Sequence, residues 1–243
     1  MSKSAALLAP LPFELVLDDG EPLETEWHTL QLPLLRELIR QAMKEQGRTD
    51  FYVGDNMFVY HSLGQAREVY GEVVEGVRPK RAFRGPDVFW VGGVDPDRRR
   101  DVWIAWEEGG RLPDVIIELL SPSTAHKDRT EKRDLYAREF ATAEYFLHDP
   151  DTRKLEGLRL AKRFYQAIQP DENGRVWSEK LGVSLGLWHG NVGGREDVWV
   201  RLFRSDGSLV PTEAEAERRR AEAAEAELAR LRALLAGRSD GAS

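Results

Sequence analysis

The chain has 243 residues, of which 41% are hydrophobic and 32% are charged, and its formal net charge is −7. This length accommodates one domain with an appendage, and the apolar fraction is sufficient for a buried core. The absence of cysteine excludes disulfides and thiolate metal sites, and it favours a reducing compartment. The negative net charge argues against an open surface that coats nucleic acid, but it is compatible with an enzyme whose local groove is basic.

The N-terminal segment is broken by proline and too short for a signal peptide or a membrane span, so we expect a cytoplasmic protein without a membrane partner. Residues 1–12 are predicted to be a flexible arm, and residues 13–210 to form one domain. Phe13 to Leu17 read as a short strand. Apolar residues at helical spacing then predict a helix over 27–46, with Pro33 near its first turn and Gly47 as its stop.

Two Pro-Asp steps each open an apolar run. The first run follows Asp87, and the second follows Asp114 and contains one acidic residue, Glu118, inside a Val/Ile/Leu strand. An amphipathic helix over 125–140 and a strand over 144–148 follow. Short strands then recur to residue 203, so the second half is predicted to be a β-rich continuation of the same domain.

The composition changes at Pro211. Thr212 and Glu215 stand at capping-box spacing, and the chain to Ala236 is almost wholly Ala, Glu, Arg and Leu. Two alternatives stay open for 211–236, a solvated single helix or a short coiled coil that forms a homodimer. For the homodimer, the globular domain is the alternative interface. Residues 237–243 are predicted to be disordered. The apolar residues of the possible coiled coil over 211–236 follow a weak heptad pattern and would form its seam, which consists of Ala221, Ala224, Leu228, Leu231 and Leu235.

Asp87 and Glu118 are expected to meet across the predicted sheet. In an antiparallel pair, the beginning of one strand lies beside the end of the next. Asp87 begins its strand, whereas Glu118 lies near the end of the following one. Asp114 shares a sheet face with Glu118, but the strand between them spans roughly 13 Å. Asp114 is therefore predicted to cap a turn or the entry to its strand.

A carboxylate inside a hydrophobic strand is costly unless another charge compensates it. Two carboxylates on adjacent strands suit a hard cation, so Asp87 and Glu118 are candidate ligands of Mg²⁺ or Mn²⁺. Such an ion lowers the pKa of a bound water and stabilises charge on a phosphate. The alternatives are that Glu118 faces solvent or pairs with an arginine, and that Asp87 only begins its strand.

These motifs carry a resemblance. Over roughly residues 13–205 the chain resembles the Uma-two family of the PD-(D/E)XK restriction-endonuclease-like superfamily. The resemblance implies an α/β (α+β) fold with a mixed central sheet flanked by helices, and a magnesium-dependent nuclease site. The residues that carry it are Pro86-Asp87, the segment from Pro113 to Thr124, Asp128, Lys132, Tyr136, Glu144-Tyr145 and Asp149-Pro150.

The sequence departs from the superfamily pattern at one position. That pattern places a lysine two residues after the acidic residue, where this chain has Leu120. Lys132, from the following helix, is the candidate replacement and the third catalytic residue beside Asp87 and Glu118. Asp128 and Lys132 are four residues apart, so a simple surface ion pair is the alternative.

Other candidates are weaker. Solvated charges at a helix start are the commoner explanation for the acidic residues before the first helix, although one of them could complete the outer shell of a metal. His126 and His148 lack metal-ligand spacing, and Trp90 and Trp188 are expected in the core. The candidates at the helix start are Glu21, Glu24, Glu26 and His28.

The leading interpretation is a metal-dependent endonuclease that hydrolyses phosphodiester bonds of DNA through a metal-activated water. The alternative is a catalytically inactive nucleic-acid- or protein-binding module on the same fold. Leu120 and the acidic net charge favour the alternative, and the intact pair of Asp87 and Glu118 favours the enzyme.

Overall fold

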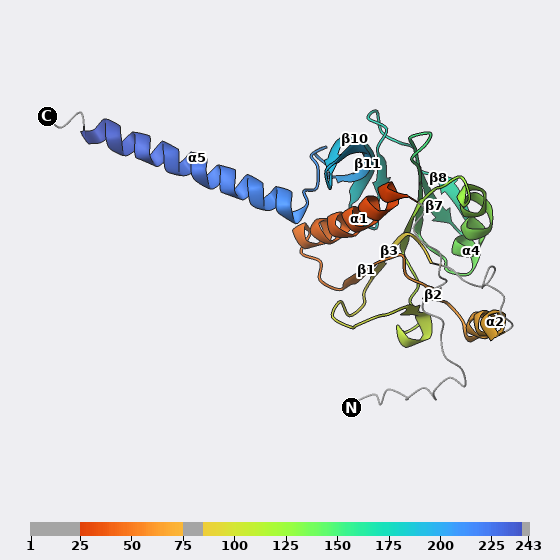
Figure 1. Cartoon of the computed structure of the whole chain (residues 1–243). Coiled ribbons are helices and arrows are strands. Elements are labelled where there is room, and N and C mark those ends of the chain that lie inside the picture. Colours follow the sequence, from red (N-terminus) through yellow and green to blue (C-terminus); the bar gives the residue numbers. More distant parts are fainter. Residues whose placement is uncertain (1–24, 75–84, 240–243) are drawn as a thin grey trace, which may run out of the picture.

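The computed structural model describes residues 25–74 and 85–239, so the predicted arm and the predicted strand over 13–17 lie outside it. A six-stranded mixed sheet organises the domain (Figure 1). Only β5 and β6 pair in parallel within it, and the helical segment over 125–138 connects them. The strands, in pairing order, are β1 (Phe51–Asp55), β3 (Val88–Gly92), β5 (Val115–Leu119), β6 (Glu144–Asp149), β7 (Lys154–Ala161) and β8 (Phe164–Ala167).

Helix α1 (Glu26–Glu45) covers one face of this sheet. The Thr25 hydroxyl caps it by accepting a bond from the His28 backbone N–H, and Gly47 ends it with a positive φ of 69°. The expected place of Pro33 was wrong, because Pro33 lies inside the helix beyond its first turn. A proline there removes one helical hydrogen bond, and the burial of the apolar face compensates this loss.

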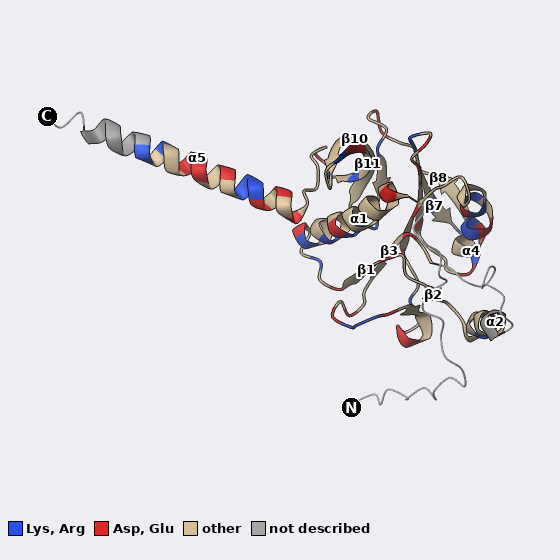
Figure 2. Cartoon of the chain, in the orientation of Figure 1, with Lys and Arg blue, Asp and Glu red and all other residues tan. Residues whose placement is uncertain are grey.

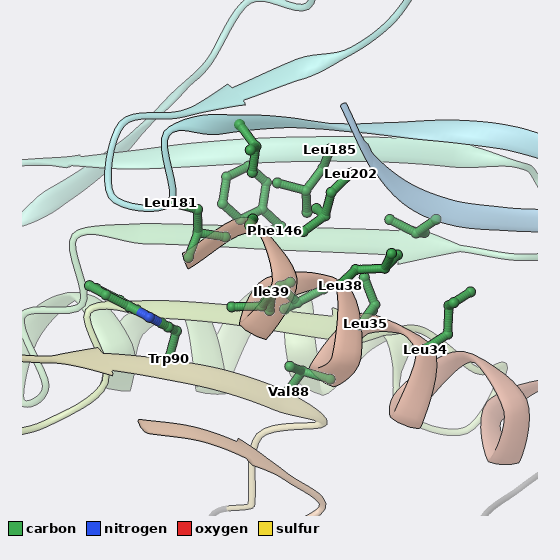
Figure 3. Close-up of a cluster of buried hydrophobic side chains, with 14 of the residues drawn as sticks. Leu34, Leu35, Leu38, Ile39, Val88, Trp90, Phe146, Leu181, Leu185 and Leu202 are labelled. Carbon is green, nitrogen blue, oxygen red and sulfur yellow. The ribbon is translucent and has the colours of Figure 1, made fainter. Parts of the chain in front are cut away.

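A second, three-stranded sheet packs on α1 from the other side. Its strands pair in the order β11, β10 and β9, and their inner side chains join those of α1 and the large sheet in one core (Figure 3). Trp90 is buried in this core and Trp188 packs against it, as predicted. The strands are β9 (Val176–Ser178), β10 (Val183–Val192) and β11 (Arg195–Phe203).

The opposite face of the large sheet is covered by a helical segment that changes its winding. It consists of α3 (Ala125–Lys127), the π-helical turn η2 (Asp128–Lys132) and α4 (Arg133–Arg138). Tyr136, Ala137 and Phe140 bury their side chains against this face. The predicted helix over 125–140 is therefore present, but its π turn was not predicted.

Small elements complete the domain. Neither α2 nor β4 was predicted from the sequence. No helix in the described ranges has the length and apolar content needed to cross a membrane. The elements are β2 (Val59–Tyr60), α2 (Leu63–Val74), β4 (Trp103–Ile104), which pairs with β2, and the 3₁₀ turn η1 (Ala105–Glu107).

Helix α5 (Glu213–Ser239) projects away from the domain (Figure 1). It includes residues 237–239, which the sequence pattern assigned to a disordered tail. A single glycine inside a helix costs only about 1 kcal/mol relative to alanine, so Gly237 does not end α5. Residues 240–243 lie outside the described part. The predicted α/β (α+β) architecture, with a mixed sheet, flanking helices, a β-rich second half and a C-terminal helix, is confirmed.

Candidate active site

The register of β3 and β5 brings Asp87 and Glu118 together. Val88 pairs with Ile117 in this antiparallel ladder, so the next position of each strand places Asp87 beside Glu118. Side chains alternate between the two faces of a strand. Phe89 and Ile116 belong to the cluster on the α4 side, and Asp87 and Glu118 therefore face the same side. The Leu119 backbone N–H donates to Asp87 Oδ2 over 2.6 Å, which fixes this carboxylate at the start of its strand.

Two side chains of the helical segment contact the buried Glu118, those of Lys132 and Tyr136, and the Asp128 side chain pairs with Lys132. Asp128, Lys132 and Tyr136 are spaced four residues apart, and the π turn between Asp128 and Lys132 keeps them on one side. The backbone carbonyl of Asp128 accepts a hydrogen bond from the Tyr145 hydroxyl over 3.0 Å. Strand β6 therefore fixes the π turn against the sheet.

Lys132 lies at the centre of this acidic cluster. Its Nζ donates to Glu118 Oε2 over 3.0 Å and lies 2.7 Å from Asp128 Oδ1. The hydroxyl of Tyr136 donates to the other oxygen of Glu118 over 2.9 Å. The Glu118 and Asp128 side chains are 1% exposed and that of Lys132 is 13% exposed, so the pair of Asp128 and Lys132 is buried and is not the surface pair of the alternative interpretation.

Burial dominates the electrostatics of the two strand carboxylates. It raises the pKa of Glu118 well above its ordinary value, against the opposing charge of Lys132. Burial also raises the pKa of Asp87, again opposed by Lys132 and by the Leu119 N–H. Asp87 and Asp128 each raise the pKa of Glu118 further. Three carboxyl groups therefore interact with one buried cation, Lys132.

Lys132 itself is held in its charged form. Burial alone would lower the pKa of its ammonium group, but Glu118, Asp128 and Asp87 together raise it above its ordinary value. Burial and the neighbouring Glu118 charge also raise the pKa of Tyr136 well above its usual range. Both groups therefore remain hydrogen-bond donors at neutral pH, and neither is available as a base.

Leu120 lies in the hydrophobic cluster on the same face of the sheet. It is 1% exposed and belongs to the cluster of Tyr136 and Ala137. A lysine at this position would compete for the space that these side chains fill. Lys132 reaches the acidic residues from the helix instead, which is the arrangement that the sequence departure suggested.

Asp114, which opens the second Pro-Asp strand, lies away from the cluster. Its carboxylate accepts a bond from the Gly92 backbone N–H over 2.9 Å, consistent with the predicted capping role. Glu26 pairs with Arg195 over 3.0 Å, whereas Glu21 and Glu24 lie outside the described residues.

The two candidate histidines, His126 and His148, both lie outside the acidic cluster around Lys132. His126 is exposed on the surface of the helical segment. His148 is fully buried, on the strand face that carries Phe146 and packs on α1. Burial lowers the pKa of His148 to about 4, and its ring lies 5.5 Å from that of Trp27. Neither histidine is a candidate ligand.

The sequence named His28 only as a weak candidate at the start of the first helix, and the structure places it beside the site. His28 is 7% exposed, and its Nδ1 lies 2.7 Å from the Thr25 hydroxyl. Its charge contributes to lowering the pKa of Asp87. His28 also lines a cleft of about 230 Å³ together with Ser121 and Pro122, which follow Glu118 in the chain. This cleft gives an approach to the end of β5, and only the fold could reveal it.

The candidate metal ligands are the carboxylates of Asp87 and Glu118. Within the described ranges, no three His, Asp or Glu side chains converge as a ready metal cage. Mg²⁺ commonly binds through one or two carboxylates, with waters and phosphate oxygens at its other positions. The pair of carboxyl groups and its buried position fit that ion.

Comparisons with known proteins place the chain in a family. A crystal structure of a "putative nuclease belonging to DUF820" from Anabaena variabilis is 15% identical, with a TM-score of 0.44, and the match covers 66% of this chain and 76% of that one. No curated protein matches. The family model Uma2, described as "Putative restriction endonuclease", matches residues 11–193. The chain therefore belongs to the Uma2 family.

Proposed function

We propose that the protein is a metal-dependent endonuclease that hydrolyses phosphodiester bonds of DNA. The observation that carries the proposal is the convergence of Asp87 and Glu118 on adjacent strands, with Lys132 Nζ 3.0 Å from Glu118. Membership of a family described as "Putative restriction endonuclease" supports the same reaction class. Asp87 and Glu118 would hold Mg²⁺ or Mn²⁺, and Lys132 would assist catalysis.

Each residue has a definite part in this mechanism. When bound, the divalent ion supplies a water of lowered pKa and stabilises charge on the phosphate. Asp87 is oriented by the Leu119 N–H, and Glu118 by the Tyr136 hydroxyl. Lys132 remains protonated, so it acts as a hydrogen-bond donor and positive charge that orients the water or stabilises the developing oxyanion.

The alternative is an inactive binding module with the same fold. Leu120 at the usual lysine position is the observation that favours it. The two proposals differ in one respect that can be measured. An enzyme needs the acidic pair to bind a divalent ion, whereas a binding module needs only the fold.

Metal titration of matched variants is the test. We expect Asp87→Asn to weaken Mn²⁺ binding by at least about 10-fold in isothermal titration calorimetry, because the variant removes one of two anionic ligands. The same variant should lose cleavage of a fluorescent DNA duplex. Asp114→Asn is the matched control, since Asp114 also follows a proline at the start of a strand but caps Gly92 instead of facing Lys132.

Asp114→Asn should bind Mn²⁺ and cleave DNA like the wild type. Equal Mn²⁺ affinities of the wild type and Asp87→Asn would remove the metal site from the proposal. Metal binding by the wild type without cleavage of any DNA substrate would favour the inactive module.

A further inference from the structure

The base of α5 is fixed to the domain. Thr212 and Glu215 form the predicted capping box, with bonds of 2.9 and 3.1 Å between side chain and backbone. The buried Arg201 donates to both oxygens of Glu215 over 3.1 and 2.7 Å. The backbone N–H of Glu213 donates to the Glu37 carboxylate over 2.6 Å. These contacts set the direction in which α5 leaves the domain.

Beyond this base, α5 has no partner in the described part of the chain. Every side chain from 217 to 232 is exposed, and Leu228 and Leu231 are 53% and 47% exposed. A helix without tertiary packing is only marginally stable in water. The ion pairs within α5, such as that of Arg220 with Glu217, are exposed and add little. A second helix packed on the leucines would supply the missing stabilisation.

The charged residues beside the seam indicate which helix packs on it. If Leu228 is position a and Leu231 position d of a heptad, Arg220 and Glu227 occupy g, and Glu225 and Arg232 occupy e. In a parallel coiled coil, each g residue faces the e residue five positions later in the partner helix. Two copies of this sequence in register therefore pair Arg220 with Glu225 and Glu227 with Arg232, always with opposite charges. Figure 2 shows acidic and basic residues interspersed along α5.

An antiparallel coiled coil forms fewer pairs of opposite charge at the e and g positions. In the antiparallel register that places Ala221 opposite Leu231, Glu225 meets Glu225 and Glu227 meets Glu227 of the other helix, because e faces e and g faces g. A shift by one heptad in one direction restores an attraction between Glu225 and Arg232, but it leaves the g charges without opposite partners. A shift in the other direction pairs Arg220 with Glu227, but it leaves Arg232 without an opposite charge and places Leu228 opposite Glu217. Only the parallel register satisfies all four charged positions.

We infer that α5 forms a parallel, in-register, two-stranded coiled coil with a second copy of this chain. The seam from Ala221 to Leu235 is short and begins with alanines, so the dimer is expected to dissociate on dilution. Because α5 starts at the domain, the parallel arrangement puts both domains at the same end of the coil. Each dimer then contains two copies of the candidate site at that end of the coil. This inference does not depend on the proposed function.

Light scattering of the full chain at several concentrations tests the assembly. We expect a dimer that dissociates on dilution, and a monomer for Leu228→Ala combined with Leu231→Ala, because the exposed leucines supply most of the seam. Circular dichroism and thermal unfolding of the domain should show that the variant remains folded. A wild-type monomer at all concentrations, or a double variant that remains dimeric, would overturn the inference.

Disulfide cross-linking tests the orientation, since the natural chain has no cysteine. Ala221→Cys and Leu231→Cys should each form a cross-linked dimer under mild oxidation, because every seam position faces its own copy in a parallel pair. Ala223→Cys, outside the seam, is the matched control and should cross-link at least about 10-fold more slowly. In an antiparallel pair only one position along the helix faces itself, so cross-linking of just one seam variant would overturn the parallel arrangement.

Charge exchange provides the second test of register. Glu227→Arg should weaken the dimer, because it places an arginine opposite Arg232 of the partner helix. Adding Arg232→Glu should restore the dimer, whereas Arg219→Glu, on the outer side of the coil, should leave it unchanged. Failure of the restoring substitution would show that these two positions do not face each other.

Discussion

Replacing Lys132 with methionine is expected to destabilise the fold by about 3–5 kcal/mol at neutral pH, the usual cost of leaving buried charges without their partner. Among the described residues, Lys132 is the only cation paired with Glu118 or with Asp128, and both carboxylates are 1% exposed. Methionine retains most of the side-chain volume, so the loss reports charge more than packing. Chemical denaturation at pH 7 measures it.

The same helix provides a matched control. Asp134 and Arg138 form an ion pair of the same four-residue spacing as Asp128 and Lys132, but their side chains are 69% and 59% exposed. Arg138→Met should therefore cost less than about 0.5 kcal/mol. Lys132→Arg should recover much of the stability by keeping the charge. Equal costs for Lys132→Met and Arg138→Met would show that the acidic cluster does not depend on Lys132.

The sequence predicted the acidic pair well because strand geometry is strict. An alternation of two residues and an antiparallel register fix which side chains share a face, so the positions of Asp87 and Glu118 along their strands were enough. The choice of Lys132 had a different basis, because it rested on the resemblance to a superfamily pattern that has a lysine where this chain has Leu120. The inference on the acidic pair needed only local pattern and the order of elements.

The environment of the pair could not be predicted in the same way. The surface ion pair of Asp128 and Lys132 stayed open as an alternative, since an i, i+4 spacing does not reveal which side of a helix is buried. The π turn and the Tyr136 contact to Glu118 depend on how the helical segment packs on β5 and β6. His28 reaches the neighbourhood of Asp87 only through the placement of α1. Such long-range packing leaves no short sequence signal.

Glu118→Gln replaces the Glu118 carboxylate with an amide of the same shape. This substitution should abolish DNA cleavage while stabilising the fold by about 1–2 kcal/mol at pH 8. Glutamine keeps the shape of Glu118 and one acceptor for the Tyr136 hydroxyl, but it removes an anionic ligand and a buried charge. The gain arises because Asp87 and Asp128 remain to balance Lys132. Activity and stability should therefore change in opposite directions.

The pH dependence of this gain follows from the raised pKa of Glu118. Protonated Glu118 favours the folded state, and this contribution is fully present below the unfolded pKa of about 4.3 and is lost as the pH rises through the folded pKa. Glutamine imitates the protonated form at every pH. The difference in melting temperature between Glu118→Gln and the wild type should therefore be near zero in acid and grow towards pH 8.

Glu131→Gln is the control for this pH series, because Glu131 lies on the same helical segment with an exposed side chain. Its melting temperature should follow that of the wild type within about 1 °C across the pH series, since exposed groups contribute little to stability. A large loss of stability in Glu118→Gln at pH 8 would identify Glu118 as a structural partner of Lys132, because the ion pair would then outweigh the cost of burying the charge. In that case the acidic pair would be explained by folding alone, and the assignment of Glu118 as a metal ligand would fail.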